Sequence, residues 1–134
     1  MSMSMSTSIG GWASALAVAG GAAVGALARW QAGVWVNPVW AGFPLGTLFV
    51  NALGGLLIGL AFVWLDRHPS EGLRLLLVTG VLGGFTTFSA FSAESLALLE
   101  RGRFELAVAH TLAHVLGALA CAALGARLMR LWLT

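Results

Sequence analysis

The sequence predicts an all-α integral membrane protein with four transmembrane helices per chain. Of its 134 residues, 59% are hydrophobic and only 9% are charged, whereas about 25% of the residues in soluble domains are charged. Four runs approach the roughly 20 apolar residues that a helix needs to cross a bilayer: 12–36, 45–65, 73–99 and 104–132. Little of the chain is left for a soluble domain, so we expect residues 10–134 to form a single transmembrane domain.

The first run follows a serine-rich stretch, residues 1–9, which we expect to be a disordered tail. A secretory signal peptide has a basic segment before its apolar core, but MSMSMSTSIGG contains no Lys or Arg. Three further apolar runs follow. We therefore expect the first run to be retained as the first helix.

Short connections with turn-forming residues separate the runs: NPVWAGFP, DRHPSEG and ERGR. Proline and glycine in these connections end the helices. Connections of this length make consecutive helices antiparallel neighbours. Both ends of the chain are therefore expected on the same side of the membrane.

The basic residues are distributed almost evenly between the two predicted faces. All seven are arginines, four near the face that holds the chain ends and three near the other. The positive-inside rule then gives almost no preferred orientation, which permits a dual-topology, antiparallel homodimer. The arginines form no basic patch, so we expect no nucleic-acid partner.

Glycines at four-residue spacing predict close helix packing, because small residues let backbones approach in lipid. Examples are Gly21 with Gly25 and Gly55 with Gly59. Four helices from one chain can hardly enclose an aqueous pathway. Oligomerisation in the bilayer is therefore expected.

Polar residues at mid-membrane depth are few, and each needs a partner because unsatisfied polar groups are costly in hydrocarbon. Asn51 lies in the second run, one turn after Thr47 and on the same face. Two interpretations remain open for Asn51: a hydrogen bond between helices, or the lining of a polar pathway.

The stretch GGFTTFSAFSAE, residues 83–94, interrupts the third run. Gly83 and Gly84 weaken the helix, and the threonines that follow can bond freed carbonyls. A break here predicts carbonyls that protein, water or an ion must satisfy. A simple kink is the alternative.

Phe85, Phe88 and Phe91 recur at three-residue spacing after these glycines. Such a stripe commonly packs in a core. Alternatively, the positive edges of the rings would suit an anion. The hydroxyls of Thr86, Thr87, Ser89 and Ser92 would then add donors.

Four other polar residues lie within the runs or near their ends. Arg29 and Glu94 are single charges in the first and third runs, and each is open to a structural role. His110 and His114 stand at i and i+4, which is also a metal-ligand spacing. No nearby third ligand is visible in the sequence, so we prefer neutral imidazoles that donate to a polar track or to another helix.

The segments GALARW, PLGTLFVNALGGLLIG and GGFTTFSAFSAE, in this order in a four-helix chain, resemble the Fluc/CrcB fluoride channels. The resemblance implies passive, fluoride-selective export across the bacterial cytoplasmic (inner) membrane by an antiparallel homodimer with two pores. It implies a channel that confers fluoride resistance, not an enzyme. It also implies a structural sodium ion at the centre of the dimer.

The resemblance also implies roles for individual residues. The backbone carbonyls of Gly83 and Thr86 would hold the sodium ion, and Arg29 and Glu94 would belong to the vestibule or the supporting structure. The resemblance places Asn51, Thr47, Phe88 and Phe91 on the pore. With the hydroxyl and imidazole donors considered above, the expected pore lining consists of Asn51, Phe88, Phe91, Thr47, Thr87, Ser92, His110 and His114.

The fourth run departs from the family pattern. It carries His110 and His114 where relatives have Tyr, Asn or Ser, and Ala118 where a Ser is common. We expect fluoride recognition to survive, because imidazole N–H groups can donate. The histidines predict an altered pH dependence of conduction.

Three other classes of function are less consistent with the sequence. A proton-coupled small multidrug transporter needs a carboxylate in its first helix, and residues 12–30 contain none. A scaffold protein would explain the glycine seams but not the phenylalanines and hydroxyls after the predicted break. A membrane enzyme would need a cluster of Asp, Glu, His or Cys at one depth, and the sequence shows none.

Overall fold

The computed structural model describes residues 7–40 and 42–134, and every regular element in these residues is a helix. Four helical segments are long and apolar enough to cross a membrane, which confirms the predicted number. The tail predicted over residues 1–9 lies largely outside the described residues, and the first helix begins at Thr7. The elements in chain order are α1 (Thr7–Val36), η1 (Asn37–Val39), α2 (Leu45–Arg67), α3 (Glu71–Leu73), η2 (Arg74–Leu82), α4 (Gly83–Phe85), α5 (Phe88–Glu100) and α6 (Phe104–Trp132).

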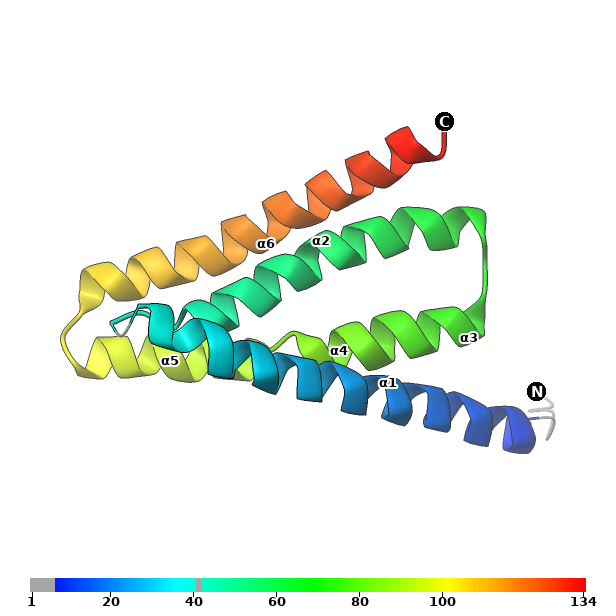
Figure 1. The fold of residues 1–134 in the computed structure, drawn as a ribbon, viewed down its shortest axis with the longest axis horizontal. Coiled ribbons are helices and arrows are strands. Elements are labelled where there is room, and N and C mark those ends of the chain that lie inside the picture. Colours follow the sequence, from blue (N-terminus) through cyan, green and yellow to red (C-terminus); the bar gives the residue numbers. More distant parts are fainter. Residues whose placement is uncertain (1–6, 41) are drawn as a thin grey trace, which may run out of the picture.

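Consecutive membrane-spanning segments run in opposite directions, as the short connections predict (Figure 1). The start of α1, the link from α2 to α3 and the end of α6 lie at one end of the molecule. The links from α1 to α2 and from α5 to α6 lie at the other end. The four segments therefore have the up-down order of a membrane bundle.

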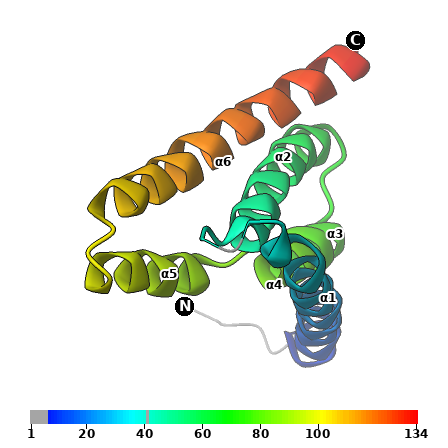
Figure 2. The ribbon, with the colours of Figure 1, turned by 60° about the vertical axis from the view of Figure 1, so that its left-hand side comes forward.

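Two seams hold the segments together. Helix α6 packs along α2, and α1 packs along η2 and α4. Helix α2 lies between α6 on one side and the pair of α1 and α4 on the other (Figure 2). Ala32, Val50 and Phe85 form the buried core where α1, α2 and α4 meet.

The connections end the helices through local chemistry. Ser70 caps α3, because its hydroxyl accepts a hydrogen bond from the Leu73 amide at 3.2 Å. Gly102 ends α5 with a φ of 70°, and the amide of Arg103 reaches back to the Leu98 carbonyl at 2.8 Å. This is the Schellman pattern, in which glycine favours the left-handed conformation.

The seam that α1 forms with η2 and α4 predicts a sharp difference between two glycines of α1. A Cβ atom at Gly25 would overlap the Val81 carbonyl oxygen and lie 2.7 Å from the Phe85 amide nitrogen, whereas a Cβ at Gly20 would meet nothing within 4 Å. We expect Gly25→Ala to destabilise the protein by about 1–3 kcal/mol through overpacking. Gly20→Ala is expected to be neutral or stabilising, because alanine favours the helix.

Thermal unfolding of the purified variants in detergent, followed by the loss of the monodisperse peak, measures this difference. Equal melting temperatures for the two variants would contradict the tight packing of α1 against η2 and α4.

Candidate functional site

The third membrane-spanning segment contains a non-helical step at Thr86 and Thr87. Both residues are extended, with φ −87° and ψ 159° for Thr86 and φ −152° and ψ 122° for Thr87. Gly83 and Gly84, where the sequence suggests a weak point, are still helical in α4. Helix α5 then begins because the Thr87 hydroxyl accepts a hydrogen bond from the Ala90 amide at 3.1 Å.

Asn51 of α2 holds this step through two hydrogen bonds. Its Nδ2 donates to the Thr87 carbonyl at 2.9 Å, and its Oδ1 accepts from the Thr87 amide at 2.8 Å. These bonds satisfy backbone groups that would otherwise be unpaired inside the bilayer. A carboxamide has two N–H donors, so one N–H of Asn51 is left for another acceptor.

The step also changes the pairing of two backbone carbonyls. In a continuous α-helix, the amides of Thr87 and Ala90 would donate to the carbonyls of Gly83 and Thr86. Here the Thr87 amide donates to Asn51, and the Ala90 amide donates to the Thr87 hydroxyl. The carbonyls of Gly83 and Thr86 thereby lose their helical donors.

Arg29 of α1 bonds to the backbone just before the step. Its Nε donates to the Gly84 carbonyl at 3.0 Å. Arg29 also lines a hollow of about 460 Å³, together with Thr47 and Thr87. The guanidinium therefore ties α1 to α4 at the edge of an open space.

The two phenylalanines of the first turn of α5 have different surroundings. Phe88 is 77% exposed, whereas Phe91 is 8% exposed, and their ring centroids are 5.3 Å apart. Phe91 stacks on His110 with centroids 5.2 Å apart and lies 4.7 Å from the ring of His114. Phe91 therefore packs against α6, while Phe88 lies on the surface of the single chain.

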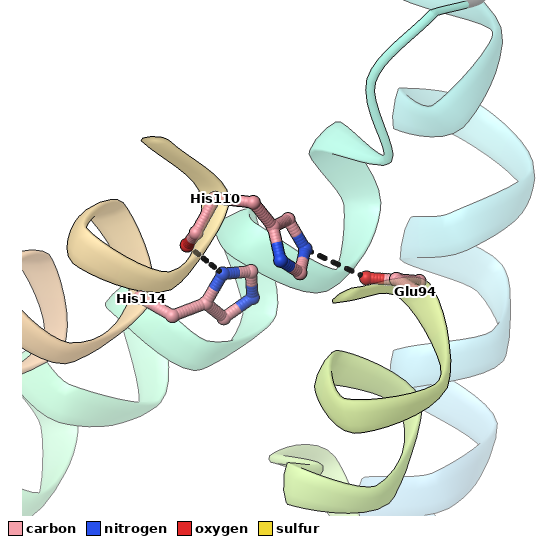
Figure 3. A group of neighbouring side chains, drawn as sticks. All are labelled: Glu94, His110 and His114. Atoms are coloured by element: carbon pink, nitrogen blue, oxygen red, sulfur yellow. Dashed lines mark hydrogen bonds and ion pairs between the residues drawn. The ribbon is translucent and has the colours of Figure 1, made fainter. Parts of the chain in front are cut away.

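Glu94 joins three helices through its carboxylate. One oxygen, Oε2, lies 3.1 Å from Nε2 of His110. The other oxygen, Oε1, accepts a hydrogen bond from the hydroxyl of Thr47 on α2. Nδ1 of His110 lies 2.9 Å from the Ser95 hydroxyl. One turn further along α6, His114 Nδ1 lies 3.0 Å from the His110 carbonyl oxygen (Figure 3).

Two predictions from the sequence, that the histidines have no third ligand nearby and that no cluster of ligand-type residues lies at one depth, are wrong. Glu94, His110 and His114 each offer a ligand atom, and these atoms all lie within 4.8 Å of one another. Ser95 and Phe43 also contact His110, and neither was predicted. The Phe43 ring stands edge-on to the imidazole, with ring centroids 5.4 Å apart. Ser95 directly follows Glu94, which is a signal that could have drawn attention to it.

A second hollow, also of about 460 Å³, brings many of the predicted site residues together. The hollow lies against α2, the non-helical step and α6. It is lined by Asn51, Gly54, Gly55, Ile58, Val78, Leu82, Gly83, Thr86, Thr87, Phe88, Phe91, His114, Val115 and Ala118.

Two of the predicted hydroxyl donors already have partners. Thr47 donates to Glu94, and Ser92 donates to the carbonyl of Phe88 in its own helix at 3.0 Å. A hydroxyl has a single proton. Thr47 and Ser92 therefore hold neighbouring groups in place in this arrangement.

Residues 16–126 match a family model described as CrcB-like protein, Camphor Resistance (CrcB). The chain is 53% identical over 112 residues to a protein of Bordetella petrii, covering 82% of this chain and 86% of that protein. It is 47% identical over 119 residues to a protein of Aromatoleum aromaticum, covering 87% of this chain and 91% of that one. Each relative is named "Fluoride-specific ion channel FluC", the name of an ion channel and not of an enzyme.

Proposed function

Because the chain belongs to the CrcB family, we propose that it is a fluoride channel. It would let fluoride leave the cell passively across the bacterial cytoplasmic membrane and so lower the toxicity of intracellular fluoride. The observation that carries this proposal is the arrangement of Phe88 and Phe91 beside the step that Asn51 holds. All three residues line one hollow, and the named relatives are fluoride channels.

The chemistry of this hollow suits a small, strongly hydrated anion. Such an ion must exchange its water for protein donors at a site firm enough to admit it and loose enough to release it. The free N–H of Asn51 and the positive ring edges of Phe88 and Phe91 are neutral partners of that polarity. His114 borders the same hollow, and Arg29 pairs with a backbone carbonyl.

The remaining predicted residues would support this pathway. Thr47 fixes Glu94, and Glu94 in turn lies beside His110, on which Phe91 stacks. This chain of contacts sets the orientation of the Phe91 ring. Thr87 belongs to the step itself, and Ser92 bonds to the carbonyl of Phe88.

The proposed assembly is an antiparallel, dual-topology homodimer with two pores. The even distribution of arginines supports insertion in both orientations. Phe88, with 77% of its surface exposed in the single chain, supports a second copy that completes the wall of each pathway. A ring edge that selects an anion needs such a water-poor surrounding.

A structural sodium ion at the centre of the dimer is part of the proposal. The carbonyls of Gly83 and Thr86 lose their helical donors at the step, and carbonyl oxygens are suitable ligands for a hard cation. When bound, sodium would supply a positive charge that ties the two steps together. The neutral oxygens of the main chain fit this ion.

Sodium removal is therefore expected to weaken the dimer. A ligand whose free concentration is a hundred times its Kd stabilises the folded state by about 2.7 kcal/mol. We expect a lower melting temperature and a shift to monomer when N-methylglucamine chloride replaces sodium chloride at equal ionic strength. Identical melting and sedimentation in both salts would contradict the sodium site.

Growth of a fluoride-hypersensitive bacterial strain that lacks its own exporter tests the proposed function in cells. Expression of the chain is expected to restore growth in millimolar fluoride, whereas expression of Phe88→Ile at equal abundance is not. Equal growth with the parent and with an empty vector, despite protein in the membrane, would refute the proposal.

A further inference from the structure

The cluster of Glu94, His110 and His114 has the composition of a transition-metal site. The two imidazole rings have centroids 4.3 Å apart on α6, and Glu94 approaches them from α5 (Figure 3). His110 is fully buried and His114 is 5% exposed. Two imidazoles and one carboxylate form a ligand set that Zn²⁺ and related divalent cations bind in proteins.

His114 presents an unpartnered nitrogen to this cluster. Its Nδ1 lies 3.0 Å from the His110 carbonyl oxygen, and a carbonyl only accepts, so Nδ1 carries the proton. In the neutral ring, Nε2 then has a free lone pair. Nε2 is buried and has no hydrogen-bond partner among the described residues, a condition that is costly unless a ligand satisfies it.

The other two ligands are held in orientations that suit a metal. Thr47 donates to Oε1 of Glu94 and leaves Oε2 for the cluster. The Ser95 hydroxyl lies 2.9 Å from Nδ1 of His110 and can accept a hydrogen bond from it. With its proton on Nδ1, the neutral imidazole would offer the lone pair of Nε2 to a metal. Outer hydrogen bonds of this kind commonly orient metal-binding histidines and carboxylates.

One pair of ligand atoms is already close to the separation found in a metal site. In a tetrahedral zinc site with bonds of about 2.0–2.2 Å, the ligand atoms lie roughly 3.4 Å apart. Here Nε2 of His110 and Oε2 of Glu94 are 3.1 Å apart, and all three ligand atoms lie within 4.8 Å of one another. A bound metal would therefore open the pair from His110 and Glu94 slightly and draw the more distant ligand atoms closer together.

We propose that Glu94, His110 and His114 bind a divalent transition cation of the Zn²⁺ class, with the fourth position open to water. One carboxylate and two neutral imidazoles would leave a bound divalent cation with a net charge of +1. His114 borders the hollow that contains Phe88 and Asn51. If the proposed fluoride pathway runs there, this charge holds the anion and slows its passage, so Zn²⁺ acts as an inhibitor.

Direct binding tests the site independently of transport. Zn²⁺ is titrated by calorimetry into the tag-free protein in detergent, with His114→Ala as the test variant. His68→Ala is the matched control, because His68 directly follows α2, away from the cluster, and its ring nitrogen lies 3.1 Å from the Trp64 carbonyl oxygen. We expect one Zn²⁺ per chain, at least about tenfold weaker binding for His114→Ala, and unchanged binding for His68→Ala.

A spectroscopic measurement keeps the proposal testable if His114→Ala does not fold. Co²⁺ replaces Zn²⁺ in the parent and in Glu94→Gln, and a tetrahedral site with nitrogen and oxygen ligands gives intense visible absorption. We expect this band in the parent and its loss or marked shift in Glu94→Gln. Absence of binding by the parent, or binding that His68→Ala abolishes, would overturn the proposal.

Fluoride efflux from liposomes separates this site from the proposed function. We expect Zn²⁺ to slow efflux through the parent and to have at least tenfold less effect on His114→Ala. Zn²⁺ binding without any fluoride flux would leave the metal site standing and refute the channel. Fluoride flux without Zn²⁺ binding would refute the metal site alone.

Discussion

Phe88→Ile is expected to reduce fluoride efflux by at least about tenfold without unfolding the protein. A ring edge that stabilises the dehydrated anion by roughly 1.4 kcal/mol accounts for a factor of ten in rate. The fold should tolerate the change, because Phe88 is 77% exposed in the single chain. Isoleucine keeps an apolar surface but has no ring. Efflux from liposomes, measured with a fluoride electrode, gives the rate.

Phe62→Ile is the matched control for this substitution. Phe62 is also an exposed phenylalanine, 56% exposed on α2, and it does not line the hollow that contains Phe88. We expect flux through this variant to match the parent. Equal flux through Phe88→Ile and the parent would remove Phe88 from the pathway.

Asn51→Ala is expected to lower fluoride efflux by roughly a hundredfold. The substitution leaves the Thr87 amide and carbonyl, now bonded at 2.8 and 2.9 Å, without partners in the membrane. Two unsatisfied groups at roughly 1–3 kcal/mol each suffice for a loss of that order. We also expect a lower melting temperature, in contrast to Phe88→Ile.

Asn37→Ala provides the control for the loss of an amide side chain. The Asn37 side chain accepts a hydrogen bond from the Gly46 amide at 2.8 Å, outside the non-helical step. Its removal is expected to change efflux far less than Asn51→Ala does. An equal loss of flux in the two asparagine variants would contradict the claim that the Asn51 bonds to Thr87 support the pathway.

The helices were predictable because apolar composition and turn residues determine where a chain crosses a bilayer. The fourth predicted run, 104–132, has the bounds of α6. The second run and α2 share their start at Leu45, and α2 continues to Arg67. Short connections also predicted the alternating directions of the helices. These features depend on local sequence.

The position of the non-helical step was less accessible. Glycine has a low helix propensity, which drew attention to Gly83 and Gly84. Both remain helical, and the extended residues are Thr86 and Thr87. The reason lies in tertiary contacts. Asn51 is 36 residues away in the chain, and its side chain supplies the hydrogen bonds that satisfy the backbone of Thr87.

The contacts of Glu94 could not be derived from spacing either. Glu94 and His110 are 16 residues apart and belong to different helices. Their approach depends on the direction in which α6 leaves the turn at Gly102, whose φ is 70°. Thr47 was likewise expected to line a pathway. Its hydrogen bond to the Glu94 carboxylate depends on the packing of α2 beside α5, which the spacing in the sequence does not reveal.

Anion efflux from liposomes that contain the purified parent protein, with fluoride and chloride compared in parallel, tests the central claim most directly. The protein is reconstituted in sodium, and selective electrodes record each anion. We predict rapid loss of fluoride with little loss of chloride. Absence of fluoride flux from the folded, sodium-supplied protein, or equal flux of both anions, would contradict a fluoride-selective channel.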